Sequence, residues 1–198
     1  MVRIFWKGLP GLFVCAFLIL AGIPLALAET DNVSVTADMN SWITISDAAN
    51  VDLGNFDRGT DSGNSTGTAE WTVATNNTTG YKLELSASTD EALRNDTSPT
   101  VYYFNDYNMD STTAPSAWSV AASAAEFGYT ASGNDVSGYS AGTLYRGFAG
   151  ASAIQIATSA LDTSGTATTA RFRAQVGSSK YLREGGYTAT ITATATSL

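Results

Sequence analysis

Two serines lie in sequence patterns that are typical of nucleophilic catalysis. Ser65 is at the centre of Gly63–Gly67 and Ser140 at the centre of Gly138–Gly142, and both segments fit G-x-S-x-G. In hydrolases with this pattern the serine passes its proton to a histidine. The chain contains no histidine, and its one cysteine, Cys15, lies in an N-terminal apolar stretch. We therefore expect no serine- or cysteine-based catalysis and no enzymatic activity.

The carboxylates offer two weaker kinds of chemistry. Two of the eighteen Asp and Glu residues could flank a glycosidic bond, so a carboxylate-based hydrolase is the least favoured function that we retain. Calcium takes only oxygen ligands, and polar loops offer Asp57 and Asp61 in one place and Asp106 and Asp110 in another. Asp, Asn and Gly are also the ordinary residues of turns. We expect no cofactor, with calcium as the alternative.

A run of aromatic residues is the candidate ligand-binding surface. Tyr102, Tyr103, Phe104 and Tyr107 follow one another closely, and Trp118 comes soon after. Neighbouring residues of a strand point to opposite faces, so these rings cannot all enter the core. Exposed rings beside a polar loop can contact a sugar or a partner protein, whereas the alternative is that they fill the core. Ligand binding is therefore predicted at Tyr102, Tyr103, Tyr107 and Trp118.

The first 28 residues have the pattern of a signal peptide. Arg3 and Lys7 precede an apolar run from Leu9 to Leu27, and Ala26 and Ala28 supply small residues before a cleavage site. We predict cleavage after Ala28 and export of residues 29–198 as a single domain. An uncleaved membrane anchor and lipid attachment at Cys15 are the alternatives, which the cleavage-site residues and the bulky residues before Cys15 disfavour.

The exported part is acidic. The whole chain has a net charge of -8, and the leader removes positive charge only, so the remainder is more negative still. An acidic surface repels nucleic acid and anionic lipid. We therefore expect neither as a partner and no membrane association once the leader is cleaved.

Period-two alternation of apolar and polar residues predicts the elements that must position these groups. It occurs in 69–73, 81–87, 172–176 and 187–196, with Gly-containing turns at 76–80 and 183–186. Further strands are predicted at Val33–Ala37, Trp42–Ile45, Val51–Phe56, Val101–Phe104, Phe127–Thr130 and Ile154–Thr158.

Short strands separated by turns predict an all-β fold, an antiparallel immunoglobulin-like β-sandwich that follows the signal-peptide helix. We expect the 76–80 turn to join its two strands into a hairpin. The Ala-rich stretch 114–126 could form one short helical turn, and 57–67 and 105–115 are predicted to be long polar loops.

Three segments carry a family resemblance. The V-D-L-G-N-F of Val51–Phe56, the W-T-V-A-T-N-N-T-T-G-Y-K-L-E-L-S-A of Trp71–Ala87 and the closing G-G-Y-T-A-T-I-T-A-T-A-T of Gly185–Thr196 resemble small secreted β-sandwich surface proteins of bacteria, the WxL-like and spore-coat-U-like group. Trp71-Thr72-Val73 stands where a WxL protein has Trp-x-Leu. The resemblance implies a location and a fold, and no catalytic residues.

These observations predict a secreted or cell-surface, non-enzymatic β-sandwich that acts as a structural, adhesive or ligand-binding module. Its partners would be a cell-surface protein or a carbohydrate. The alternative is a fibre or pilus-like subunit that binds copies of itself, because residues 29–37 or the C-terminal strand could add to the sheet of a neighbour.

Overall fold

A computed structural model describes residues 33–56, 63–95, 101–108 and 114–198. The chain divides into two compact units, Met1–Asp38 and Met39–Leu198. In the described residues the protein is all-β: they contain strands and one short 3-10 turn, η1 (Ser140–Gly142), and no α-helix. Four of the smaller predicted strands are confirmed with shifted ends, as β1 (Ile43–Ile45), β5 (Tyr102–Tyr103), β8 (Ala125–Gly133) and β10 (Ile154–Ser159).

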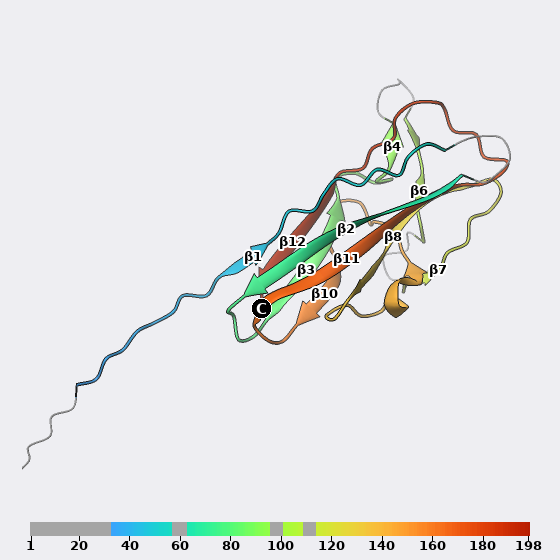
Figure 1. The fold of residues 1–198 in the computed structure, drawn as a ribbon. Helices are drawn as coiled ribbons and strands as arrows, with labels where there is room; N and C mark the ends of the chain where they lie inside the picture. Colours follow the sequence, from blue (N-terminus) through green and yellow to red (C-terminus); the bar gives the residue numbers. More distant parts are fainter. Residues whose placement is uncertain (1–32, 57–62, 96–100, 109–113) are drawn as a thin grey trace, which may run out of the picture. The chain divides into compact units, whose positions relative to one another are not determined.

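The larger sheet has five strands in the order β1-β2-β11-β8-β6 (Figure 1). Its centre is the long antiparallel pair of β2 (Asn64–Thr75) and β11 (Thr163–Val176), in which Ala170 lies opposite Ala69. At the far edge β6 (Asn105–Asp106) runs parallel to β8. We call this sheet A.

The second sheet, sheet B, has three antiparallel strands in the order β10-β3-β12. Its central strand β3 (Tyr81–Ala87) pairs along its whole length with β12 (Ile191–Ser197). Two short pairs complete the fold, β4 (Arg94–Asn95) with β5 and β7 (Ser116–Ala117) with β9 (Leu144–Tyr145).

Both sheets contribute to one hydrophobic core. Alternation places Trp71 and Val73 of β2 and Phe172 of β11 on the inner face of sheet A, while Leu83 and Leu85 of β3 enter from sheet B. In Figure 1, β2 and β11 lie in front of β3 and β10. The alternation read from the sequence therefore predicts correctly which side chains of these strands are buried.

Several predicted elements are wrong. Residues 33–37 and 51–56 form no strand, although Val51, Leu53 and Phe56 still pack against the core. The loop predicted for 57–67 ends earlier, because Asn64–Gly67 belong to β2, where they pair with the far end of β11. The stretch 114–126 contains β7 and the start of β8 in place of a helical turn, and the 105–115 loop opens with β6.

The prediction that the 76–80 turn joins two strands into a hairpin is wrong. β2 belongs to sheet A and β3 to sheet B, so the turn crosses between the sheets. Gly80, at its end, has a φ of 86°, and a Cβ there would lie 1.9 Å from the carbonyl oxygen of Ser159. The turn therefore needs glycine for both its backbone conformation and its close packing. The connection between β11 and β12 likewise changes sheets.

Candidate functional site

The calcium candidates are represented in the structure by Asp106 alone, since Asp57, Asp61 and Asp110 lie outside the described residues. Asp106 is 3 % exposed, and its Oδ2 accepts a hydrogen bond of 3.2 Å from the backbone N–H of Ala92. Burial raises the pKa of this carboxyl to about 7. Among the described residues no three acidic, histidine or cysteine side chains gather where they could hold a metal ion.

The two G-x-S-x-G serines lie in different surroundings. Ser65 is inside strand β2, where its hydroxyl donates to the carbonyl oxygen of Leu53. Ser140 begins η1 and is exposed, with a φ of 44°. Neither position is the turn between a strand and an α-helix that the hydrolase motif requires.

The candidate aromatic residues divide into two groups. Tyr107 and Trp118 come together on the outer face of sheet A, where their rings stack with centroids 4.4 Å apart. Tyr102 and Tyr103 lie on β5, in a separate two-stranded pair, and no ring contact among the described residues joins them to the first group. Tyr103 is 40 % exposed, whereas Tyr107 is only 7 % exposed.

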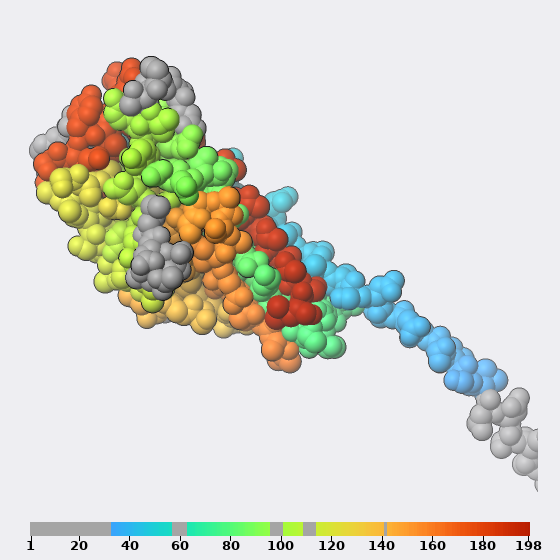
Figure 2. Space-filling view, turned by 180° about the vertical axis from the view of Figure 1, so that it is seen from behind, coloured from blue at the N-terminus to red at the C-terminus, as the bar shows by residue number. Residues whose placement is uncertain are grey.

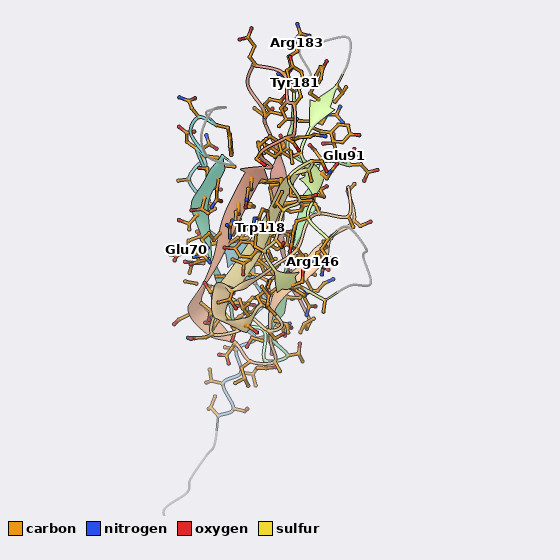
Figure 3. The ribbon with its side chains drawn as sticks, turned by 90° about the vertical axis from the view of Figure 1, so that its right-hand side faces the viewer. Glu70, Glu91, Trp118, Arg146, Tyr181 and Arg183 are labelled. Atoms are coloured by element: carbon orange, nitrogen blue, oxygen red, sulfur yellow. The ribbon has the colours of Figure 1, made fainter. Side chains whose placement is uncertain are left out.

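Trp118 is held firmly in place. Its Nε1 donates a 2.6 Å hydrogen bond to Oε1 of Gln175 on β11, and the edge of its ring meets Tyr145 of β9 at 5.1 Å. Tyr107 covers one face of the indole. Trp118 lies over the middle of the strands, well away from Tyr181 and Arg183 (Figure 3).

Two arginines that were not among the predicted site residues complete this cluster. The guanidinium carbon of Arg173 lies 4.9 Å from the centre of the Trp118 ring. The guanidinium groups of Arg171 and Arg173 lie 5.7 Å and 5.6 Å from the Tyr145 ring. All three distances fall within the range of cation–π attraction. We call Arg171, Arg173, Trp118 and Tyr145 the arginine platform. The outward alternation of Arg171, Arg173 and Gln175 was its only sequence signal.

A second candidate site is a groove of about 1710 Å³, whose lining combines polar and apolar residues. Its walls are formed by residues 48–56 and by 177–191, the segment that leads into β12. Core side chains line its floor, among them Trp71, Phe104 and Phe172. The sequence carried no local signal for it, because the lining comes from segments that are far apart in the chain.

The edge of sheet B borders this groove. β12 is the last strand of its sheet, and among the described residues its only ladder partner is β3. Figure 2 shows β12 as a red band at the margin of the sheet, beside the blue segment that contains β1. The inward residues Ala189, Ile191 and Ala193 pack against the core but remain only partly buried.

Apolar residues near the N-terminus are strongly exposed. Val33, Val35 and Met39 are 81 %, 89 % and 85 % exposed. They alternate with the polar residues Ser34 and Thr36, which is the pattern of a strand with one buried face. In an extended segment these exposed side chains would form one apolar face.

The described residues include no helix of sufficient length and apolar character to cross a membrane. Comparison with family models, curated proteins and solved structures finds no match for this chain.

Proposed function

We propose that this protein is a secreted or cell-surface, non-enzymatic β-sandwich of the immunoglobulin-like class with a structural function. Its copies associate by strand addition: residues 33–39 of one copy occupy the groove of the next and pair with the edge of β12 that β3 does not cover. The single observation that carries the proposal is that the chain has both a groove with an aromatic floor beside a sheet edge and an exposed segment with strand alternation.

The donor segment has the chemistry that the groove requires. In an extended segment Val33, Val35, Ala37 and Met39 lie on one face. Seven residues at about 3.3 Å each span about 23 Å, which is the length of an ordinary strand. Burying each valine or methionine side chain contributes about 1.5–3 kcal/mol. The polar residues between them would face solvent.

β12 has an edge that could accept the donor segment. Among the described residues β12 has no ladder partner besides β3, and β1 lies beside it without forming a ladder, so this edge could accept another strand. Ala189, which lines the groove, has a small and partly buried side chain against which a valine could pack. An added strand would cover Trp71 and Phe172 from the groove side and extend sheet B by one strand.

The sandwich assignment is supported by the shared core of sheets A and B and by the changes of sheet after β2 and β11. The signal-peptide pattern and the resemblance to WxL-like and spore-coat-U-like proteins support export. A role on the cell surface then follows from an exported domain that builds assemblies.

Light scattering after size-exclusion chromatography tests the proposal on the exported chain, residues 29–198. We expect oligomers whose size increases with protein concentration. A Val33→Asp/Val35→Asp variant should be monomeric, because burying two carboxylates against the aromatic floor of the groove is costly. The matched control, Ser34→Asp/Thr36→Asp, adds the same charge to the opposite face and should still assemble. A monomeric wild type, or equal behaviour of the two variants, would refute strand addition.

A further inference from the structure

We infer that the arginine platform is a binding site for the oxyanions of an acidic polysaccharide, with carboxylate or sulfate groups as the recognised chemistry. The inference rests on the outer face of sheet A and is independent of strand addition at the groove. Arg171 and Arg173 would bind the anionic groups, and the neighbouring hydroxyls of β2 would bind the sugar.

The two guanidinium groups act as a pair because of strand geometry. Arg171 and Arg173 are two residues apart on β11, so both side chains leave the same face of the sheet. Both lie within 6 Å of one ring, that of Tyr145. Two like charges repel each other when they share a small surface. A bound oxyanion would remove that repulsion.

Each guanidinium group is oriented by neutral partners. Arg173 donates from Nε to Oδ1 of Asn64 at 3.0 Å and lies over Trp118, while Arg171 donates to the carbonyl oxygen of Gly142. Trp118 is itself fixed by Gln175 and Tyr107, as described above. The site is therefore preorganised, which lowers the entropy lost when a ligand binds.

The positive charge of the platform is not matched by a carboxylate in the part of the chain that the structure describes. There, the ion pair within 4 Å joins Lys82 to Glu84, at 2.9 Å. Glu70, on the same face, accepts a hydrogen bond from Thr169 instead. The planar guanidinium group forms two parallel hydrogen bonds with a carboxylate or a sulfate. The local positive charge of the platform is thus available to an anionic ligand, although the net charge of the chain is negative.

Sugar fits this surface better than nucleic acid. Thr66 and Thr68 are exposed on β2 directly opposite Arg173 and Arg171, and their hydroxyls can bond to sugar hydroxyls. Single-stranded nucleic acid is held by bases that stack on open aromatic faces. Trp118 offers no such face, because Tyr107 covers one side and Arg173 the other.

Titration calorimetry on residues 29–198 tests the inference with four probes: polygalacturonate for carboxylate, dextran sulfate for sulfate, uncharged dextran, and a single-stranded DNA oligonucleotide. We expect one or both anionic polysaccharides to bind, dextran not to bind, and DNA to bind more weakly. The polysaccharide that binds more tightly identifies the anionic group.

An Arg171→Gln/Arg173→Gln variant should weaken this binding at least about tenfold, or about 1.4 kcal/mol. The matched control is Lys82→Gln/Lys180→Gln, which removes the same charge elsewhere and should weaken binding much less. An Arg171→Lys/Arg173→Lys variant keeps the charge but loses the planar guanidinium group. Its affinity should lie between those of the wild type and the Gln variant. Unchanged thermal unfolding would confirm that each variant is folded. Failure of both anionic polysaccharides to bind, equal losses in the Gln variant and its control, or tighter binding of DNA would overturn the inference.

Discussion

The buried carboxyl group of Asp106 makes the stability of the fold depend on pH. In the folded chain burial raises its pKa from 3.8 to about 7. Between these two pH values the folded state therefore holds a proton that the unfolded state has released. Stability contributed by this group is highest at acidic pH and is lost as pH rises, until the group ionises in the folded state as well.

The linkage relation gives the size of the effect. With these two pKa values, raising the pH from about 5 to about 8 removes about 2.5 kcal/mol from the free energy of unfolding. Asp106→Asn keeps a neutral side chain of the same shape, with an oxygen that can still accept from the N–H of Ala92. The Asp106→Asn variant should not show this loss. From pH 5 to pH 8 its free energy of unfolding should therefore rise by about 2.5 kcal/mol relative to that of the wild type.

Urea unfolding followed by tryptophan fluorescence, at a series of pH values, measures this difference. Asp162→Asn is the matched control, because Asp162 is exposed. Its pH profile should run parallel to that of the wild type. If the profile of Asp106→Asn also runs parallel to the wild type, the reasoning about the buried carboxyl is refuted.

Three further predictions concern the core, the turn between the sheets and the leader. Phe172→Ala should lower the free energy of unfolding by about 3–5 kcal/mol, because the ring is 5 % exposed and contacts Phe127 and Tyr129. The control is Thr194→Ala, on the exposed face of β12, which should lower it by less than about 0.5 kcal/mol in the same urea titration. Gly80→Ala should cost at least about 2 kcal/mol, since its Cβ would overlap a carbonyl oxygen, and a smaller loss would contradict the close packing of the turn. Mass spectrometry of the exported protein should give a chain that begins at Glu29, and an intact leader would contradict the predicted cleavage.

The sequence predicted individual strands well because burial of one face leaves a direct trace. In β3, for example, the apolar positions from Tyr81 to Ala87 are all buried. It predicted the pairing of strands poorly, because a Gly-containing turn such as 76–80 is compatible with a hairpin or with a crossing between sheets. Residues 33–37 carry strand alternation without being a strand, which is what a segment that pairs only with another copy would show.

The candidate sites were harder to predict than the strands. Asp106 has the carboxylate oxygens that a calcium site uses, but its burial depends on distant residues that no local pattern reveals. Tyr107 and Trp118 lie together as ring neighbours, and their predicted role in ligand binding stays a prediction. The arginine that covers Trp118 comes from β11, more than fifty residues later in the chain, so no local pattern joins the two. The groove is formed by two segments that lie far apart in the sequence, so it could be recognised only in the folded structure.

Intermolecular disulfide formation tests strand addition most directly, because residues 29–198 contain no cysteine of their own. One population would carry a cysteine at position 33, 35 or 37, and the other Ala189→Cys in the groove. Mixing them under mild oxidation should yield a disulfide-linked heterodimer for at least one of the three positions. Thr192→Cys, on the exposed face of β12, should yield none. Absence of a heterodimer with all three donor positions, or equal cross-linking to position 192, would contradict the proposed insertion of residues 33–39 into the groove.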